Sequence, residues 1–449
     1  RREVEGHGAT SRGDVMLVSF DLSSRTRSCI IILIASVFVC ILSFQGRGNA
    51  GWGTERLGAP VTSRCGRVST PGLRRCPNLP FRRTMDRLRR DVKVNSAAEI
   101  NAITEKSLEA LKANAPESMG SMMSILEEFM HEYAHTNILA ETPAAKYAEV
   151  MGQSMQVMGQ ALSQPHKFEI LHRAIRQPFD YYRWGVDFFR PLIEQDTSML
   201  YGVSNLEKVV NYIEKGDNVV ILSNHQTEVD PQAIEILLED QGCDLASELI
   251  FVAGHKVTTD PLAIPFSLGQ NLLCIHSKKY IEKPPEKKAE KQAHNTRTMK
   301  KMQELLEEGS AFLWVAPSGG RDRPDPESRE FVVAPFDERS VQMFKLMANK
   351  ANRNSGKDTH FFPMAMLTHE LVPPPDGVQA QVGEKRSAKR GAAMIWFGEE
   401  VKDERVEGVA DRQRHAIFYE NVMKQVLEKY DELAKERKNQ LEKLKVEAS

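Results

Sequence analysis

The chain has few cysteines and almost no net charge, and both features exclude classes of protein. Its 449 residues carry 60 Lys and Arg against 61 Asp and Glu, a formal charge of −1. Balanced charge, with no basic or aromatic-interleaved motif, gives no indication of a nucleic-acid partner. None of the 6 cysteines forms a CxxC pair or a Cys/His cluster, so neither a disulfide framework nor a metal site is predicted. Cys243 and Cys274 are expected to be buried thiols in a reducing compartment.

Long apolar runs are also scarce, and the clearest one extends from Cys29 to Phe44. It is shorter than the roughly 20 residues that a membrane-spanning helix needs. Small residues follow at 48–50, as at a signal-peptidase site, and Arg25 and Arg27 precede it. Residues 1–50 are therefore predicted to be a signal-peptide-like leader, with a single membrane anchor as the alternative. The mature chain is expected to make at most peripheral membrane contact.

The next segment, residues 51–90, has few acidic residues. It carries 10 arginines but only Glu55 and Asp86 as acids, the composition of a disordered transit peptide. The alternative is a disordered tail with no targeting role. A signal-like segment followed by a transit-like one resembles the bipartite leaders of proteins sent to plastids of secondary endosymbiotic origin. That resemblance implies delivery to the plastid stroma.

From about Asp91 the composition is that of a folded body. Between 91 and 175, apolar residues recur at three- and four-residue spacing, which predicts a small helical domain. Between 176 and 449, short apolar runs alternate with amphipathic stretches, which predicts an α/β fold: a mostly parallel sheet covered by helices. The strands are expected at 219–222, 249–253, 272–276, 312–315 and 361–366, and two of the helices at 295–308 and 409–446.

Two segments place a histidine five residues before an aspartate: His225 with Asp230, and His255 with Asp260. A proline follows each aspartate, which is also typical of a helix start capped by aspartate. The spacing alone therefore fits either a cap or a catalytic pair. His225 directly follows an apolar run, so it is expected at the carboxyl end of a parallel strand, where open α/β sheets bind ligands. The residues after His255 are instead typical of a turn beside the site. His225 is the expected catalytic base.

A glycine-rich turn at 316–326 offers two arginines, Arg321 and Arg323, after another apolar run. Arginine binds phosphate through paired hydrogen bonds. Gly319 and Gly320 either present backbone amides to an anion or only allow the chain to turn. The other interpretation of this segment is a solvated loop in which the arginines pair locally with Asp322.

Four segments, 223–231, 259–267, 277–279 and 316–326, together resemble the motifs of soluble plastid glycerol-3-phosphate acyltransferases, in the order of that family. The similarity extends over about residues 95–445. The Ser-Gly-Gly-Arg-Asp-Arg version of the last motif is typical of the plastid branch of the glycerolipid acyltransferase superfamily. The resemblance implies transfer of an acyl group from acyl carrier protein, or from acyl-CoA, to the sn-1 hydroxyl of glycerol 3-phosphate, giving lysophosphatidic acid. No cofactor is implied.

The resemblance also implies roles for individual residues. His225 would take the proton of the substrate hydroxyl, and Asp230 would orient the imidazole. The substrate phosphate would lie against Lys279 and the turn that carries Gly319, Gly320, Arg321 and Arg323. Where the family has a second histidine, this chain has Tyr280, which can donate a hydrogen bond but supplies no titratable positive charge.

Two other functions remain open from the sequence. A 1-acylglycerol-3-phosphate acyltransferase shares the histidine and aspartate spacing but usually has membrane-embedded apolar segments. A non-catalytic module that binds acyl carrier protein or lipid would show no turnover. The lysines between 283 and 301 could dock an acidic carrier protein, but the glutamates among them dilute the field and favour a solvated loop and helix face.

Overall fold

The computed structural model describes residues 80–114, 120–163, 166–260, 262–277, 281–375, 386–402 and 410–448. The predicted leader and most of the transit-like segment lie outside these residues, as do Lys279 and Tyr280. The first described helix, α2 (Pro80–Asn114), begins within the transit-like segment. Residues 80–90 are therefore helical where the composition predicted disorder.

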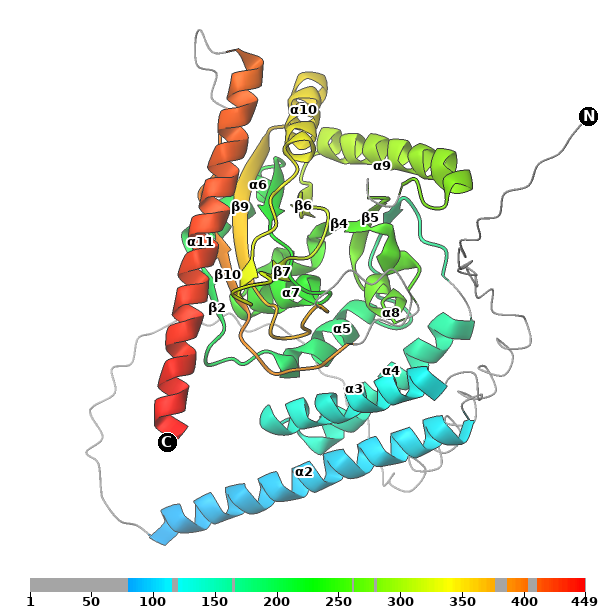
Figure 1. Ribbon diagram of the computed structural model, residues 1–449, viewed down its shortest axis with the longest axis vertical. Helices are drawn as coiled ribbons and strands as arrows, with labels where there is room; N and C mark the ends of the chain where they lie inside the picture. Colours follow the sequence, from blue (N-terminus) through cyan, green and yellow to red (C-terminus); the bar gives the residue numbers. More distant parts are fainter. Residues whose placement is uncertain are drawn as a thin grey trace, which may run out of the picture.

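An eight-stranded sheet forms the centre of the described chain (Figure 1). Its strand order is β1-β5-β4-β6-β3-β9-β10-β2. Strands β5, β4, β6, β3 and β9 are parallel neighbours, and β10 is parallel to β2. Two pairs are antiparallel, β1 with β5 and β9 with β10, so the predicted mostly parallel sheet is confirmed and its edges are mixed. The strands are β1 (Leu171–His172), β2 (Met199–Tyr201), β3 (Asn218–Ser223), β4 (Ile250–Gly254), β5 (Asn271–Ile275), β6 (Phe312–Val315), β9 (Thr359–Leu367) and β10 (Met394–Phe397).

The central strand, β3, is buried on both faces, and its residues divide between two hydrophobic cores. Val219 and Ile221 belong to one core, while Val220 and Leu222 belong to the other. Successive side chains of a strand point to opposite faces of the sheet. An unbroken apolar run is therefore what a strand covered on both sides requires.

The first face is covered by α5 (Tyr181–Phe189), α6 (Val203–Glu214), α7 (Asp230–Asp240) and α8 (Ile264–Leu268). Figure 1 shows α2 below them, together with α3 (Gly120–Leu139) and α4 (Ala144–Ser163). One contact that joins this helical part to the layer on the sheet is the Tyr133 hydroxyl, which donates to the carbonyl oxygen of Phe188 on α5 at 2.9 Å. The short 3₁₀ helices are η2 (Arg190–Leu192), η3 (Asp244–Glu248), η4 (His255–Thr258) and η5 (Pro285–Lys287).

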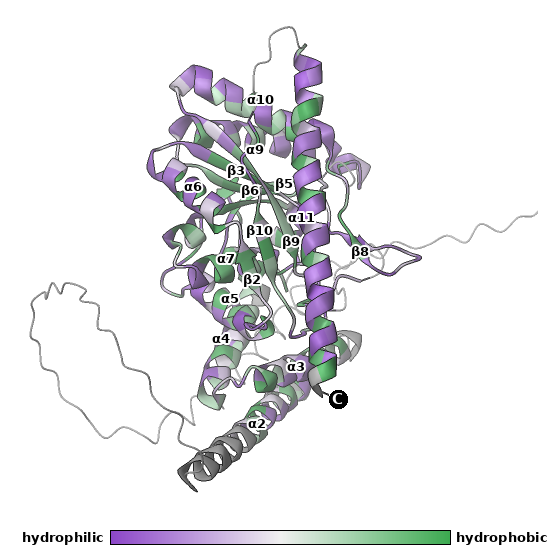
Figure 2. Cartoon of the chain, turned by 90° about the vertical axis from the view of Figure 1, so that its left-hand side faces the viewer, coloured by the Kyte–Doolittle hydropathy of each residue, from purple (hydrophilic) through white to green (hydrophobic). Residues whose placement is uncertain are grey.

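The second face is covered by α9 (Lys288–Glu308), α10 (Glu338–Ser355) and α11 (Asp411–Ala448). Figure 2 shows α11 running along the sheet beside β9 and β10, with mostly hydrophilic residues on its visible side. Its buried side includes Phe418, Val422 and Val426. The helix predicted at 295–308 is longer, because it begins at Lys288. A small ribbon pairs β7 (Arg323–Pro324), at the end of the glycine-rich turn, with β8 (Phe331–Val332).

None of the described helices has an apolar stretch long enough to cross a membrane.

Candidate active site

The site is built first from the end of β3. This strand ends at Ser223, and the loop 224–229 leads into α7. The loop is held against β9: the Asn224 amide donates to the carbonyl oxygen of Met366 at 2.9 Å and accepts from its N–H at 2.8 Å. His225 is thus presented from a buried, doubly anchored loop at the carboxyl edge of the parallel strands.

His225 and Asp230 form a hydrogen-bonded pair, with Nδ1 of the ring 2.7 Å from Oδ2 of the carboxylate. Asp230 has no exposed side-chain surface, whereas the His225 side chain is 26% exposed. Because a carboxylate oxygen accepts, Nδ1 carries the proton and Nε2 keeps its lone pair. This is the tautomer that a general base requires.

Three further donors fix the Asp230 carboxylate. Oδ2 accepts from the N–H of Gln226 at 2.7 Å, and Oδ1 accepts from the N–H of Thr227 at 3.2 Å. The Thr368 hydroxyl, from the end of β9, donates to Oδ1 at 2.6 Å. Asp230 is the first residue of α7 and is not its cap, because Val229 holds that position. Its side chain binds the loop before the helix, which orients the imidazole.

The glycine-rich turn meets this loop directly. The N–H of Asp322 donates to the carbonyl oxygen of His225 at 2.6 Å. Gly319 adopts a left-handed conformation with φ of 67°, which favours glycine there, and Gly320 is exposed beside it. The turn that carries both arginines is therefore bonded to the residue that carries the imidazole.

The two arginines have different surroundings. A guanidinium nitrogen of Arg321 lies 3.6 Å from Oε1 of Glu228, a residue of the His225 loop, and the Arg321 side chain is 14% exposed. Arg323 donates to two backbone carbonyl oxygens of its own turn, those of Arg321 at 3.2 Å and Asp322 at 2.9 Å. Arg321 is therefore held beside the His225 loop, and Arg323 is held against the backbone of its own turn.

The alternative for this turn, a solvated loop in which the arginines pair with Asp322, does not describe Asp322. The residue is completely buried. Its carboxylate accepts from the side-chain amides of Asn224 at 2.8 Å and Gln226 at 3.3 Å, and from the N–H of Ala334 at 2.9 Å. Burial raises the pKa of Asp322 to about 6, although these hydrogen bonds lower it. Asp322 thus joins the loop after β3 to the turn after β6.

The second histidine and aspartate do not pair. Nδ1 of His255 lies 3.1 Å from the Thr258 hydroxyl, within the same helical turn. The buried Asp260 carboxylate instead accepts from Arg386 at 2.8 Å and from the N–H of Leu262 at 3.0 Å. The same five-residue spacing therefore gives a hydrogen-bonded pair at His225 and Asp230, but not at His255 and Asp260.

Arg386 is a residue that sequence reasoning missed. Besides Asp260, its guanidinium contacts Glu228 at 2.7 Å. Glu228 consequently lies between Arg386 and Arg321. Nothing in the charged segment around Arg386 indicated that it would be largely buried, because its partners are more than 100 positions away in the chain.

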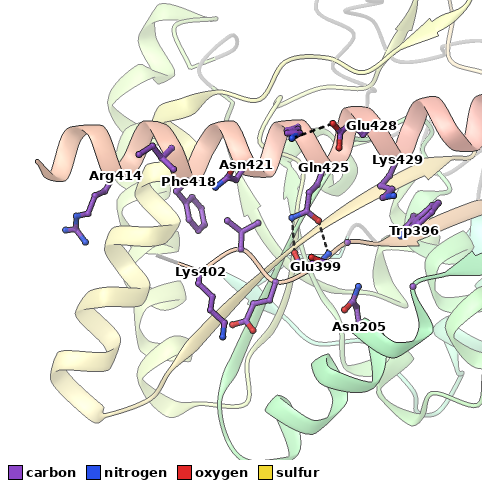
Figure 3. Close-up of a pocket in the computed structure, with 16 residues that line it drawn as sticks. Asn205, Trp396, Glu399, Lys402, Arg414, Phe418, Asn421, Gln425, Glu428 and Lys429 are labelled. Carbon is purple, nitrogen blue, oxygen red and sulfur yellow. Dashed lines mark hydrogen bonds and ion pairs between the residues drawn. The ribbon is translucent and has the colours of Figure 1, made fainter. Parts of the chain in front are cut away.

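A groove of about 800 Å³ lies elsewhere, between α6, the end of β10 and α11 (Figure 3). Trp396, Lys402 and Gln425 are among its lining residues, and none of the predicted site residues is. Strand β10 runs antiparallel to β9, so the residues after it lie at the opposite edge of the sheet from His225. The groove is therefore separate from the candidate site. Within the described ranges, no group of three or more His, Cys, Asp or Glu side chains is arranged to hold a metal ion.

The chain is similar to known acyltransferases. Residues 203–367 match the family model described as Acyltransferase. Glycerol-3-phosphate acyltransferase ATS12, chloroplastic, of Cucurbita moschata is 38% identical over 322 residues, which is 71% of this chain and 67% of the relative. Glycerol-3-phosphate acyltransferase, chloroplastic, of Arabidopsis thaliana is 38% identical over 265 residues, covering 58% and 56%. Its counterpart in Spinacia oleracea is 36% identical over 297 residues, covering 65% and 61%.

The aligned part of the chain therefore spans about two thirds of the Cucurbita relative and less of the other two. The acyltransferase match, residues 203–367, contains the His225 loop, the glycine-rich turn and β9. The chain belongs to the family of chloroplastic glycerol-3-phosphate acyltransferases.

Proposed function

We propose that the protein is a glycerol-3-phosphate 1-O-acyltransferase that takes its acyl group from acyl carrier protein. Family membership supports the reaction class, and the His225–Asp230 pair supports the role of a base. The product is 1-acyl-glycerol 3-phosphate, lysophosphatidic acid. The choice of acyl carrier protein over acyl-CoA follows the resemblance to the soluble plastid enzymes.

In the proposed mechanism, the substrate alcohol is the nucleophile. Nε2 of His225 takes the proton as the sn-1 oxygen attacks the thioester carbonyl. The new C–O bond forms, the C–S bond breaks, and the proton passes from the imidazolium to the leaving thiolate. Asp230 stabilises the positive ring while it holds that proton, as in a hydrolytic triad without its serine. No covalent intermediate with the protein is needed.

The substrate phosphate is assigned to Arg321 and Arg323, with Lys279 and Tyr280 completing the pocket as the resemblance implies. Gly319 and Gly320 shape the turn. Guanidinium groups form charge-assisted, often bidentate hydrogen bonds with phosphate. Arg321 has the Glu228 carboxylate at 3.6 Å, and a phosphate would compete with that carboxylate.

One observation carries the proposal: the hydrogen bond of 2.6 Å between the N–H of Asp322 and the carbonyl oxygen of His225. It places the backbone of the base next to the turn between the two arginines. Glycerol 3-phosphate carries its reactive hydroxyl and its phosphate on one three-carbon molecule. A base and a cationic turn in direct contact suit a substrate of that size.

The location is proposed to be the plastid stroma, reached through a signal-like and a transit-like segment. The chloroplastic relatives support a plastid location. A fusion of residues 1–90 to a fluorescent reporter tests it. Accumulation inside the plastid is the expected result, and secretion or retention in the endoplasmic reticulum would refute it.

The activity is tested by incubating the protein with glycerol 3-phosphate and acyl carrier protein loaded with an acyl chain. Thiol release that depends on glycerol 3-phosphate, with one acyl group at the sn-1 oxygen for each thiol, is expected. Thiol release that requires 1-acyl-glycerol 3-phosphate instead would identify a 1-acylglycerol-3-phosphate acyltransferase. Binding of the carrier protein without thiol release would identify a non-catalytic module.

A further inference from the structure

Arg386, between β9 and β10, connects the His225 loop to the segment that follows η4. Its Nε is 2.7 Å from Oε2 of Glu228 and its Nη2 is 3.4 Å from Oε1, so one edge of the guanidinium faces both carboxylate oxygens. Nη2 also donates to the buried Asp260 carboxylate at 2.8 Å. The Arg386 side chain itself is 14% exposed. Arg386 therefore fixes where the Glu228 carboxylate lies.

The backbone next to Arg386 is anchored by the helical part of the chain. The Glu132 carboxylate on α3 accepts from the hydroxyl of Ser387 at 2.6 Å and from the N–H of Ala388 at 2.9 Å. The Thr136 hydroxyl, one turn further along α3, lies 3.2 Å from the carbonyl oxygen of Ala388. A side chain that is bound at its head and anchored at its backbone keeps one geometry, as positioning of a neighbouring group requires.

The carboxylate that Arg386 binds lies beside the proposed phosphate pocket. Oε1 of Glu228 is 3.6 Å from a guanidinium nitrogen of Arg321, which is longer than a hydrogen bond. Glu228 is therefore bound more closely by Arg386 than by Arg321. The substrate phosphate is an anion as well, so the two anions would compete for Arg321. The affinity of the pocket for phosphate then depends on where the Glu228 carboxylate is held.

Removal of Arg386 would leave Glu228 without its closer cation. A carboxylate that is partly removed from water is destabilised when it loses its ion-pair partner. The Glu228 side chain is half-buried, and Arg321 is already within 3.6 Å of it. The carboxylate is therefore expected to move toward Arg321. A closer pair between these two side chains would have to be broken before the phosphate could bind.

We propose that Arg386 is a positioning residue for substrate binding, which holds the Glu228 carboxylate and so limits its competition with the substrate phosphate for Arg321. This rests on the proposed function, because that function places a phosphate on Arg321, and it adds a residue beyond the predicted site. Arg386 acts through Glu228 and is not assigned a contact with the substrate. Asp230 is fixed by its own loop and by Thr368, so the catalytic pair is expected to keep its geometry in an Arg386 variant.

Calorimetry with glycerol 3-phosphate alone, without an acyl donor, measures binding apart from catalysis. Arg386→Gln is expected to bind it about 10-fold more weakly than the unaltered protein, the effect of one lost charged hydrogen bond. Glu228→Gln is expected to bind it at least as tightly as the unaltered protein, because the competing charge is absent. For the same reason, the double variant with both substitutions is expected to match Glu228→Gln. Recovery in the double variant separates positioning through Glu228 from a general loss of structure.

Two further variants serve as controls. Arg190→Gln removes another arginine that bridges two carboxylates, Glu239 at 3.1 Å and Asp240 at 2.6 Å, at the opposite end of α7 from the site. It is expected to bind glycerol 3-phosphate like the unaltered protein. Arg386→Lys replaces Arg386→Gln should the latter not fold, since lysine keeps the charge but lacks the planar fork that faces both carboxylate oxygens. Its loss of affinity is expected to be smaller and to be removed in the same way by Glu228→Gln.

Unchanged affinity in Arg386→Gln would overturn the proposal. So would weaker binding in Glu228→Gln, or a double variant as weak as Arg386→Gln. In thiol release, the KM for glycerol 3-phosphate is expected to rise in Arg386→Gln while kcat stays unchanged, and a fall in kcat with an unchanged KM would contradict the proposal. Binding of glycerol 3-phosphate by the unaltered protein without acyl transfer would refute only the proposed function, and absence of that binding would overturn both.

Discussion

The two histidine and aspartate spacings, identical in sequence, differ completely in structure. His225 and Asp230 are 2.7 Å apart, while His255 bonds to Thr258 and Asp260 bonds to Arg386. In both cases a residue distant in sequence decides the outcome. Thr368 donates to Asp230, and Arg386 forms an ion pair with Asp260. A local spacing therefore becomes a catalytic pair only where the surrounding fold holds the carboxylate toward the ring.

The sharpest test of this difference is to remove each ring. His225→Ala is expected to lower kcat by about 100-fold or more, the usual contribution of a positioned base. His255→Ala should leave kcat nearly unchanged, because its ring does not contact an aspartate. Thiol release at saturating substrates measures both. Similar kcat values for His225→Ala and the unaltered protein would remove His225 from the mechanism.

Removing the second aspartate should affect stability. Asp260→Ala leaves Arg386 without one of its two carboxylates in a buried position, at a cost of about 3 kcal/mol in the free energy of unfolding. The matched control is Asp240→Ala, which removes a more exposed pair with Arg190 and should cost less than about 1 kcal/mol. Urea denaturation measures both. Equal losses in the free energy of unfolding would mean that the ion pair between Asp260 and Arg386 stabilises the fold no more than a surface ion pair does.

The arginines of the glycine-rich turn should affect substrate binding. Arg321→Ala and Arg323→Ala are each expected to raise the KM for glycerol 3-phosphate by about 10- to 150-fold, since each removes a charged hydrogen bond. Arg353→Ala, on the exposed side of α10, is the control and should not change this KM. An unchanged KM in a turn variant would exclude that arginine from the phosphate pocket.

The smallest effect is expected from Asp322, and it depends on pH. A buried carboxyl with a pKa of about 6, above its ordinary value, stabilises the fold below the ordinary pKa and loses that contribution as pH rises through about 6. The free energy of unfolding should therefore fall by on the order of 1 kcal/mol more between about pH 5 and 8 in the unaltered protein than in Asp322→Asn. If the free energy of unfolding changed equally with pH in the two proteins, this prediction would be contradicted.

The elements that follow local patterns were predictable from the sequence. The runs at 219–222 and 312–315 are β3 and β6, because a strand buried on both faces must be apolar throughout. The start of α9 was missed, since Ala289 is the one apolar residue between Lys288 and Gln292 and gives no periodic signal. The strands β1 and β2 are two and three residues long, too short to produce a pattern.

The candidate site was predictable only where its residues are close in sequence. The motif around His225 indicated its pairing with Asp230. Asp322 and Arg386 could not be recognised, because a charged residue in a charged segment suggests a solvated loop until the fold buries it. The partners of Asp322 and Arg386 come from other elements of the chain, and a single sequence does not indicate which distant residues will contact each other.

The most direct test of the central claim is a structure of the protein with glycerol 3-phosphate bound. The sn-1 hydroxyl is expected within about 2.6–3.2 Å of Nε2 of His225, the reach of a general base, with phosphate oxygens on Arg321 or Arg323. A phosphate bound in the groove beside α11, or a hydroxyl directed away from the imidazole, would contradict it.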